Sequence, residues 1–316
     1  MGDQVYDLII VGAGPAGLAA SIYASRYCLR HLVVGSQEGG ALSWAAEVEN
    51  YPGFKKISGL DLTNKMVEQV KALGAEVLAR EVVSIEKKDG IFEVRLNKNQ
   101  FFQSKTLLVA TGTERRKLDV PGEAKYLGKG VSYCTTCDGN FFKEKAVAMV
   151  GGSNAAALGA YYLSEIASKI YLVYRRRPLR AEPFWQERLR EKPNIKIIYE
   201  TNVIEILGDE NKVTGVKLDK AYQGKKELSL EGVFVEIGGF PGTQLVKALG
   251  VELDEGGFIK VTADMKTNIE GLFAAGDVAN ATGEFRQIVT ATAEGAIAAN
   301  SIYKYLKGGQ KNEGES

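Results

Sequence analysis

Residues 8–17, Leu8-Ile9-Ile10-Val11-Gly12-Ala13-Gly14-Pro15-Ala16-Gly17, join an apolar run directly to a glycine-rich turn. A buried strand followed by such a turn and then a helix is typical of the parallel βαβ unit that binds a dinucleotide. The glycines let the backbone come close to a pyrophosphate, and Pro15 suits the first turn of the helix. These residues therefore predict a dinucleotide-binding domain at the start of the chain.

The same plan recurs later in the chain. Ala146-Val147-Ala148-Met149-Val150 is a second apolar run, and Gly151-Gly152-Ser153-Asn154-Ala155-Ala156 is the turn after it. A helix is expected from about Asn154 to Ser164, followed by a strand at Lys169–Tyr174. Such a duplication predicts two related domains rather than one long sheet. The expected fold class is α/β, with two Rossmann-like, three-layer dinucleotide-binding domains.

Each predicted domain also contains a short alternating pair of segments. Val82–Glu86 and Ile91–Leu96 form the first pair, and Lys212–Asp219 and Glu227–Leu230 form the second. Alternation of apolar and polar residues is typical of half-buried antiparallel strands. We therefore expect a small antiparallel addition in each domain.

A Cys-x-x-Cys pair, Cys134-Thr135-Thr136-Cys137, lies between the two glycine turns. The chain has three cysteines and one histidine, so a four-ligand zinc site would need this pair, Cys28 and His31 to converge. Cys28 and His31 lie together near the end of the first predicted helix, remote from the pair, and we expect no metal. Two nucleotide sites and a dithiol describe an electron path. One nucleotide delivers electrons, one holds them, and a disulfide receives them.

The bulk composition excludes several classes of partner. A formal net charge of +1 gives no electrostatic reason to expect nucleic acid or an anionic membrane. No stretch approaches the roughly 20 apolar residues of a membrane span. The first predicted strand begins within a few residues of Met1, which leaves no room for a signal peptide. We expect a cytoplasmic protein, where a Cys-x-x-Cys pair is more often catalytic or metal-binding than structural.

Six segments, taken in order along the chain, form a specific pattern. They are Gly12-x-Gly14-x-x-Gly17, Val48-Glu49-Asn50-Tyr51-Pro52-Gly53-Phe54, Ala110-Thr111-Gly112, Tyr133-Cys134-Thr135-Thr136-Cys137-Asp138-Gly139, Gly276-Asp277 and Arg286-Gln287. With these segments the chain resembles the low-molecular-weight, flavin-dependent thioredoxin reductases over nearly its whole length. One glycine turn alone would be weak evidence, whereas six segments in this order are strong evidence.

The resemblance implies a division of the chain into two domains. An FAD-binding domain would be formed by residues 1–113 and 242–316. A nicotinamide-nucleotide-binding domain, residues 114–241, would be inserted into it and would carry the dithiol. A hinge would lie at Gly112 and at Gly238–Gly242, and the protein would be a homodimer.

The resemblance also implies which residues hold FAD. Asp277 would bind the ribityl chain, although on its own it could equally be a turn aspartate. Gln287 and the adjacent backbone would lie near the pyrimidine edge of the flavin. The acidic residue expected about 20 positions after the glycine turn is absent, because Val34-Gly35-Ser36 occupies that place. The predicted FAD-binding residues are Gly12, Gly14, Pro15, Ala16, Gly17, Asn50, Ala110, Thr111, Gly112, Gly276, Asp277, Arg286, Gln287 and Ile288.

By the same resemblance, Cys134 is the outer nucleophile toward thioredoxin and Cys137 lies against the flavin. Asp138 is the candidate acid–base partner, because thiolate chemistry needs proton delivery and removal nearby. The alternative for Asp138 is a carboxylate that only starts a helix or a turn.

The second nucleotide site departs from the family pattern. Ser153 stands in place of the usual third glycine, Leu158-Gly159 in place of an acidic pair, and Tyr174 in place of the first residue of a His-Arg-Arg motif. Arginines follow the strand, and guanidinium groups there favour a 2′-phosphate and hence NADPH, unless they form only a solvated basic turn. The predicted nicotinamide-binding residues are Gly151, Gly152, Ser153, Asn154, Ala155, Arg175, Arg176 and Arg180.

The sequence thus predicts a thioredoxin-disulfide reductase that passes electrons from NADPH through FAD and the Cys134–Cys137 dithiol to a thioredoxin-like protein. Two other hypotheses stay open. One is a ferredoxin- or NADH-driven disulfide reductase of the same fold. Loss of the third glycine and of the acidic pair is the type of change expected in a member that takes electrons from ferredoxin. The other is a non-enzymatic flavoprotein redox sensor. The retained arginines argue against ferredoxin as the donor.

Overall fold

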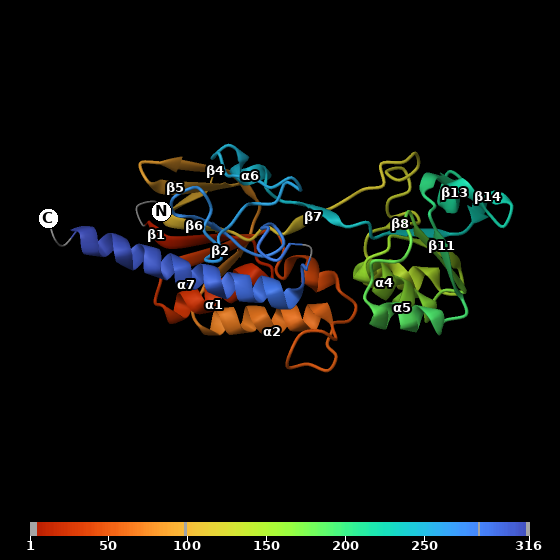
Figure 1. Cartoon of the computed structure of the whole chain (residues 1–316), viewed down its shortest axis with the longest axis horizontal. Helices are drawn as coiled ribbons and strands as arrows, with labels where there is room; N and C mark the ends of the chain where they lie inside the picture. Colours follow the sequence, from red (N-terminus) through yellow and green to blue (C-terminus); the bar gives the residue numbers. More distant parts are fainter. Residues whose placement is uncertain (1–4, 98–99, 284, 314–316) are drawn as a thin grey trace. The chain divides into compact units, whose positions relative to one another are not determined.

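The computed structural model describes residues 5–97, 100–283 and 285–313 and divides the chain into two compact units. The first unit comprises Met1–Glu114 and Phe240–Ser316, and the second comprises Arg115–Gly239. Each unit is built around its own sheet, which is mixed in the first unit and parallel in the second (Figure 1). The segments where the chain passes from one unit to the other, β7 (Thr113–Arg115) and β16 (Gly239–Pro241), pair as a two-stranded sheet.

Seven strands form the main sheet of the first unit, in the order β3-β2-β1-β6-β5-β4, with β17 also paired to β6. They are β1 (Tyr6–Val11), β2 (His31–Gly35), β3 (Glu76–Ala79), β4 (Val82–Lys88), β5 (Ile91–Leu96), β6 (Phe101–Val109) and β17 (Leu272–Ala274). All pairs are parallel except β4–β5 and β5–β6. The predicted antiparallel pair is therefore present, but it continues the main sheet instead of forming a separate addition, because β5 pairs with β6.

Both faces of the parallel strands are covered. Leu8 and Ile10 of β1 belong to one buried cluster, which includes the alanines of α1 (Pro15–Arg26) and α7 (Ile288–Glu313). Ile9 and Val11 belong to a second buried cluster, which includes apolar residues of β4 and β5. Coverage on both faces explains why the strands are continuous apolar runs rather than alternating ones.

Helices α1 and α7 pack closely because small residues face each other. A Cβ atom added to Gly295 of α7 would lie 2.0 Å from the backbone oxygen of Ala16, so only glycine fits there. Figure 1 shows the two helices side by side, with α2 (Gly59–Ala72) next to α1. This packing brings the C-terminal helix against the first glycine turn. The remaining short helices of this unit are η1 (Gly40–Trp44) and α6 (Gln244–Lys247).

The second unit repeats the plan with a five-stranded parallel sheet in the order β11-β10-β9-β15-β8. Helices α4 and α5 share a buried cluster with one face of the sheet, and a three-stranded antiparallel sheet shares another cluster with the other face. The elements are β8 (Val131–Ser132), α3 (Thr135–Asp138), η3 (Gly139–Phe142), β9 (Ala146–Val150), α4 (Asn154–Ser164), β10 (Lys169–Tyr174), α5 (Pro183–Arg190), β11 (Ile195–Tyr199), β12 (Val203–Gly208), β13 (Val213–Tyr222), β14 (Lys225–Ser229) and β15 (Gly232–Val235).

The predicted α/β fold with two Rossmann-like, three-layer arrangements is confirmed. The helix predicted from Asn154 to Ser164 and the strand at Lys169–Tyr174 are present with these bounds as α4 and β10. The second antiparallel pair is present as β13 and β14, but β12 completes a three-stranded sheet that was not predicted. Within the described ranges, no helix has both the length and the apolar character needed to cross a membrane.

Candidate active site

The first glycine finger (residues 12–17) connects β1 to α1, and two of its glycines are required by close packing. A Cβ atom on Gly12, which has φ +122°, would lie 2.1 Å from the backbone oxygen of Ala110, and one on Gly17 would lie 1.9 Å from that of Gly12. Gly14 differs, since its nearest neighbour would be the oxygen of Gly39 at 3.9 Å. Protein packing therefore does not require a glycine at position 14. The space there is at the N-terminus of α1, which no side chain caps.

The end of β6 lies directly beside this finger. The backbone N–H of Ala110 donates to the oxygen of Val11 at 2.7 Å, which continues the pairing of β1 and β6 into the turn. Thr111 Oγ donates to the backbone oxygen of Gly242 at 2.8 Å. The predicted segment 110–112 thus stands at the carboxyl ends of adjacent parallel strands, where α/β sheets bind their ligands.

The Gly276-Asp277 segment reaches the same place from the C-terminal part of the chain. The N–H of Ala275 donates to the oxygen of Val109 at 3.0 Å, and a Cβ atom on Gly276 would lie 2.9 Å from that of Ala16. Burial raises the pKa of the Asp277 carboxyl, and the Arg286 guanidinium partly opposes this effect. A carboxyl group, an arginine and the first finger therefore meet at one edge of the sheet.

Glu294 is a residue of this site that the sequence analysis missed. It is buried in α7, and its carboxylate accepts the N–H of Gly276 at 2.6 Å. Burial raises the pKa of Glu294, while the hydrogen bonds from Gly276 and the Thr282 side chain lower it in part. The sequence does contain an indication of it, because Glu294 is a single carboxylate among small residues of a helix that packs in the core. Glu is almost never buried without partners, so its presence there suggests a polar contact.

Asn50 and Gln287, which are far apart in sequence, are in direct contact. Asn50 Nδ2 donates to Gln287 Oε1 at 3.0 Å, just before α7 begins at Ile288. The guanidinium carbon of Arg286 lies 3.6 Å from the centre of the Phe258 ring, and its buried Nε has no hydrogen-bond partner within the described ranges. A buried donor of this kind is available to a bound ligand.

These features fit an elongated ligand with a pyrophosphate, such as FAD. The uncapped N-terminus of α1 and the space at Gly14 suit the phosphates. The unpaired Nε of Arg286 and the Asn50–Gln287 amides suit a polar ring edge. The fourteen predicted FAD-binding residues all belong to the segments just described or adjoin them.

The dithiol forms a disulfide in the second unit. Cys134 and Cys137 are joined, with their Cα atoms 5.4 Å apart. Cys134 precedes α3, and its sulfur accepts the N–H of Cys137 at 3.2 Å. Cys137 is exposed and Cys134 is partly buried. The outer and inner roles of the two sulfurs, which came from the family resemblance, stay predictions.

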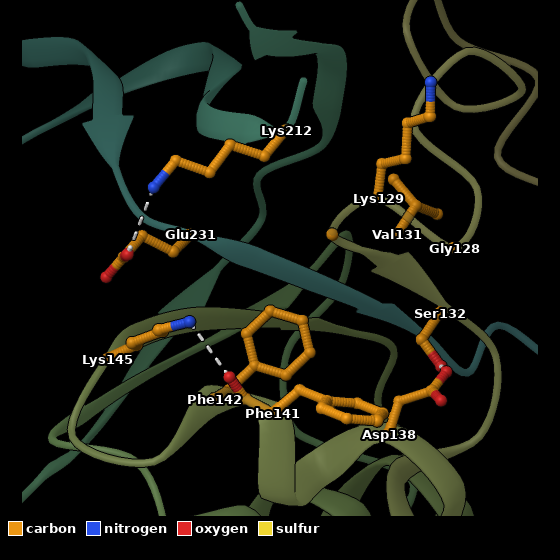
Figure 2. Close-up of a pocket in the computed structure, with 11 residues that line it drawn as sticks. Gly128, Lys129, Val131, Ser132, Asp138, Phe141, Phe142, Lys145, Lys212 and Glu231 are labelled. Carbon is orange, nitrogen blue, oxygen red and sulfur yellow. Dashed lines mark hydrogen bonds and ion pairs between the residues drawn. The ribbon is translucent and has the colours of Figure 1, made fainter.

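Asp138 is tied to the dithiol through a buried serine. Ser132 Oγ donates to Asp138 Oδ2 at 2.6 Å and accepts the backbone N–H of Cys134 at 2.9 Å. The N–H of Asp138 donates to the oxygen of Cys134 at 3.2 Å. Figure 2 shows the Ser132 hydroxyl and the Asp138 carboxylate facing each other. The predicted acid–base residue is therefore held beside the cysteine pair.

A pocket of about 220 Å³ opens beside Asp138 (Figure 2). Phe141 and Phe142 form its apolar side. Lys129 and Lys145 add positive charge, whereas Lys212 pairs with Glu231 at 3.9 Å. Phe141 is 73% exposed, so its ring is accessible from solvent beside the pocket. This pocket was not predicted from the sequence. The sequence feature that could have indicated it is the pair Phe141-Phe142, a few positions after Cys137, with Lys143 and Lys145 following.

The second glycine finger (residues 151–156) connects β9 to α4 with a backbone like that of the first. Gly151 has φ +147°, and a Cβ atom on it would lie 2.1 Å from the oxygen of Glu236. Ser153 precedes α4 with φ −89° and ψ 178°, close to the φ −81° and ψ −175° of Gly14. Any residue can adopt this extended backbone. The departure at Ser153 therefore leaves the fold intact.

The loop after β10 folds back onto this finger. The N–H groups of Arg180 and Ala181 donate to the oxygen of Gly152 at 2.8 and 3.0 Å. Asn154 uses both its amide atoms on Glu182: Nδ2 donates to Oε1 at 2.9 Å, and Oδ1 accepts the N–H at 2.7 Å. These two bonds hold the Asn154 side chain against Glu182 at the start of α4.

The three predicted arginines are exposed beside the finger. The side chains of Arg175, Arg176 and Arg180 have no hydrogen bond or ion pair with the described residues. Arg177 differs, because its guanidinium carbon lies 4.9 Å from the centre of the Tyr199 ring. The solvated basic turn and the phosphate site both fit this exposure, but three unpaired guanidinium groups near a glycine finger suit an anionic ligand.

The replaced acidic pair, Leu158-Gly159, serves the packing of α4. Leu158 packs against the buried cluster of the second unit. A Cβ atom on Gly159 would lie 2.8 Å from Met149 Cε and 3.0 Å from Thr135 Cγ2, inside the Cys-x-x-Cys segment. The absence of a side chain at position 159 therefore lets the dithiol helix pack closely on α4.

A metal site is not indicated. In residues 5–97, 100–283 and 285–313, no group of three or more His, Cys, Asp or Glu side chains could hold a metal ion. His31 Nε2 lies 2.8 Å from Ser21 Oγ and Nδ1 lies 3.0 Å from the oxygen of Leu29, so both ring nitrogens are in use.

The comparisons with known proteins agree with this geometry. Residues 6–295 match the family described as pyridine nucleotide-disulphide oxidoreductase, and the chain belongs to this family. It is 40% identical over 308 residues to a thioredoxin reductase of Listeria innocua, covering 96% of this chain and 95% of the relative.

Solved structures give the same result. The thioredoxin reductase of Lactococcus lactis, in a conformation labelled FR, matches with a TM-score of 0.91 and 36% identity, covering 96% of this chain and 99% of that one. The thioredoxin reductase of T. acidophilum matches with a TM-score of 0.90 and 37% identity, covering 96% and 100%. The resemblance inferred from six sequence segments is confirmed.

Proposed function

We propose that the protein is a thioredoxin-disulfide reductase that uses NADPH and FAD. The observation that carries the proposal is the Cys134–Cys137 disulfide, held beside Asp138 in a unit that also has a nucleotide-type glycine finger. In this proposal residues 1–113 and 242–316 bind FAD, and residues 114–241 bind the nicotinamide nucleotide. Membership of the pyridine nucleotide-disulphide oxidoreductase family supports the same assignment.

The residues of the first unit would hold FAD at the ends of β1 and β6. The pyrophosphate would bind at Gly14 and the N-terminus of α1, the ribityl chain at Asp277, and the ring edge near Arg286 and Gln287. The chemistry that the flavin supplies when bound is the conversion of a hydride from NADPH into an electron pair available to a disulfide. The chain's own contribution is to bind and orient both cofactors.

The dithiol passes the electron pair to the partner by thiol–disulfide exchange. In the reduced protein, the Cys134 thiolate attacks one sulfur of the partner's disulfide, which breaks that bond and releases the other sulfur as a thiolate. The Cys137 thiolate then attacks Cys134 Sγ, re-forms the Cys134–Cys137 disulfide and releases the partner's second sulfur. The partner gains two electrons and two protons, and the dithiol is oxidised.

Asp138 handles the protons of this exchange. Its carboxylate lines the pocket and is joined through Ser132 to the Cys134 backbone. In this proposal it takes a proton from a cysteine thiol and gives one to a leaving thiolate. Replacement of Asp138 by Asn keeps the shape and removes the proton acceptor. General acid–base groups accelerate reactions by roughly 10²- to 10⁴-fold. The rate of thioredoxin reduction in Asp138→Asn should therefore fall by at least about 10²-fold.

The pocket beside Asp138 is the proposed contact surface for the thioredoxin-like partner. The exposed Phe141 offers an apolar anchor close to the dithiol, and Lys129 and Lys145 offer positive charge around it. An aromatic anchor within a charged rim is typical of a protein–protein contact. This arrangement suits a partner with an apolar patch and acidic residues near its own disulfide.

Arg175, Arg176 and Arg180 support NADPH over NADH. Because their guanidinium groups have no ion-pair partner within the described part of the chain, they are free to bind a 2′-phosphate. Replacing Arg176 by Gln should raise KM for NADPH by about tenfold, equivalent to ~1.4 kcal/mol, and leave KM for NADH nearly unchanged. Equal changes for both nucleotides would identify the arginines as a solvated basic turn.

Replacement of the cysteines by serine tests the enzymatic proposal directly. Cys134→Ser and Cys137→Ser should each abolish NADPH-driven reduction of thioredoxin while the protein keeps its FAD. Cys28→Ser is the matched control, because Cys28 is a free cysteine outside the disulfide, and it should retain full activity. Full activity of either dithiol variant would overturn the mechanism and favour a redox sensor without reductase chemistry.

A homodimer and a cytoplasmic location complete the proposal. The homodimer comes from the family resemblance. The location comes from the Cys-x-x-Cys pair, which in a reducing compartment is more often catalytic than structural. Sedimentation velocity tests the first and fractionation of cells that express the protein tests the second. Ferredoxin as the electron donor is not favoured, because the nicotinamide-side arginines are retained.

A further inference from the structure

We propose that Ser132 is a positioning residue of the dithiol chemistry. Its hydroxyl joins the Asp138 carboxylate and the Cys134 backbone into one hydrogen-bonded unit, so that proton transfer at Asp138 depends on Ser132. This inference rests on the proposed function, since it assigns a role within the same redox site. No sequence motif pointed to Ser132.

The contacts of Ser132 fix the direction of each hydrogen bond that its hydroxyl makes. The side chain is buried, 4% exposed, at the end of β8, which pairs with β15. Its oxygen lies 2.6 Å from Asp138 Oδ2, 2.9 Å from the Cys134 nitrogen and 3.2 Å from the Cys134 oxygen. A hydroxyl has one hydrogen to donate, and the shorter contact to the carboxylate takes it. The Cys134 N–H then occupies a lone pair of the same oxygen.

The three residues form a closed set of hydrogen bonds. Ser132 donates to Asp138, Cys134 donates to Ser132, and the N–H of Asp138 donates to the Cys134 oxygen at 3.2 Å. Loss of the Ser132 hydroxyl would leave the Cys134 N–H without its acceptor and the carboxylate without this donor. Both the nucleophile's backbone and the acid–base group would lose a fixed position.

The pocket explains why a buried hydroxyl matters here. Ser132 and Asp138 both line the 220 Å³ pocket, so protons on Asp138 can exchange through it (Figure 2). Asp138 is partly buried and Ser132 is fully within the protein. Ser132 is thus placed to hold the carboxylate at the boundary between the dithiol and the pocket.

A double-mutant cycle distinguishes this role from simple structural support. If Ser132 acts through Asp138, Ser132→Ala should lower the rate of thioredoxin reduction by about tenfold, and it should add less than about twofold when Asp138 is already Asn. If the fold-loss of the double variant equals the product of the two single fold-losses, the two residues act independently and the proposal is wrong. Full activity of Ser132→Ala would also overturn it.

The matched control is another buried serine. Ser104 on β6 is 0% exposed, and its hydroxyl donates to the Thr106 oxygen at 2.7 Å. Ser104→Ala removes a comparable buried hydrogen bond from the first unit and should leave the rate of thioredoxin reduction and its pH profile unchanged. An equal loss in Ser104→Ala and Ser132→Ala would mean that general destabilisation, not positioning, explains the effect.

A second measurement does not depend on the proposed function. The protein, in a Cys28→Ser background, is reduced with dithiothreitol, and the rate of iodoacetamide alkylation of its two remaining thiols is followed against pH. The midpoint in Ser132→Ala should match that of Asp138→Asn and differ from that of the wild type. A wild-type midpoint in Ser132→Ala would refute the role of Ser132, even if thioredoxin proved not to be the substrate.

Discussion

The first glycine finger, residues 12–17, and the second, residues 151–156, share a backbone but differ where a pyrophosphate would bind. Gly14 and Ser153 both precede a helix, with φ and ψ angles within a few degrees of each other. A side chain would fit sterically at position 14, where the nearest atom to an added Cβ is 3.9 Å away. The glycine there is not needed for folding, whereas the second finger carries a serine at the same point.

The two fingers also differ in how their second residue packs against the strand that follows the helix. In the first unit, Ala13 faces Gly35 of β2, where a Cβ atom would lie 2.7 Å from the Ala13 nitrogen. In the second unit, Gly152 faces Tyr174 of β10, whose ring would lie 2.4 Å from a Cβ atom at position 152. The small and large residues are exchanged between the fingers. The two fingers therefore have the same backbone conformation but different side chains around it.

This comparison separates glycines that the fold requires from glycines that a ligand requires. Gly12 and Gly151 belong to the first kind, because backbone atoms of neighbouring strands fill the space beside them. No backbone atom fills the space beside Gly14 in this way, and the proposed FAD site accounts for the glycine there. In the proposed function, the nucleotide preference of the second unit is therefore assigned to its arginines rather than to its finger.

The largest expected effect comes from the pair that the fold requires. Gly12→Ala should cost about 3 kcal/mol or more in unfolding free energy, because the residue has positive φ and its Cβ overlaps the Ala110 oxygen. The purified variant should lack FAD. Gly151→Ala should instead keep FAD and lose bleaching by NADPH, as measured by the flavin-to-protein absorbance ratio and by NADPH titration. Loss of FAD from both variants would contradict the assignment of one nucleotide to each finger.

A somewhat smaller effect is expected at Gly152. Gly152→Ala pushes against the Tyr174 ring and should cost roughly 2 kcal/mol, the usual range for overpacking. In a Tyr174→Ala background the same change should cost much less, because the obstructing ring is gone. Urea unfolding of the four proteins in this cycle measures the difference. Equal costs in both backgrounds would show that the contact does not limit residue 152.

The fold could be predicted from the sequence because its signals are local. The apolar runs before Gly12 and Gly151 need burial on both faces, and this alone indicates a parallel sheet with covered faces. The addition of β4 and β5 to the main sheet could not be predicted, because that pairing depends on Phe101–Val109 lying beside Ile91–Leu96. The local pattern of apolar and polar residues does not indicate that β5 pairs with β6.

The site was predicted only in part. Cys134, Cys137 and Asp138 are adjacent in sequence, so their grouping follows from the motif. Glu294 is 18 positions from the Gly276 nitrogen that it binds, and only the packing of α7 on the sheet brings the two together. The pocket beside Asp138 likewise combines residues from segments that are distant in sequence, such as Lys212 and Lys129.

An exchange between Gly14 and Ser153 sharpens the comparison further. Gly14→Ser should leave the unfolding free energy within about 0.5 kcal/mol, the usual range for a change without steric conflict. FAD affinity should fall by about tenfold, equivalent to ~1.4 kcal/mol, because the side chain takes space meant for the pyrophosphate. Ser153→Gly should alter the Kd of NADPH by less than about threefold. Retention of normal FAD affinity in Gly14→Ser would show that the space at this position is not used.

The smallest effect concerns pH and the single histidine, His31, which lies in the first unit. Burial lowers its pKa from the ordinary value of about 6.5, so the folded state favours the neutral ring. The stability that His31 contributes is present above about pH 6.5 and decreases as the pH falls through the window below it. His31→Gln should weaken this dependence between about pH 8 and pH 5.5 in urea unfolding. An unchanged pH dependence would contradict the burial argument.

Whether NADPH reduces the bound flavin can be measured by anaerobic titration of the purified flavoprotein with NADPH and then with NADH, with the flavin absorbance as the readout. We predict that NADPH bleaches the flavin in proportion to the amount added and that NADH does so far less effectively. The Cys134→Ser variant should still bleach, since the dithiol acts after the flavin. Bleaching by dithionite but by neither nucleotide would contradict the account and identify the second finger as a site that no longer serves a nicotinamide.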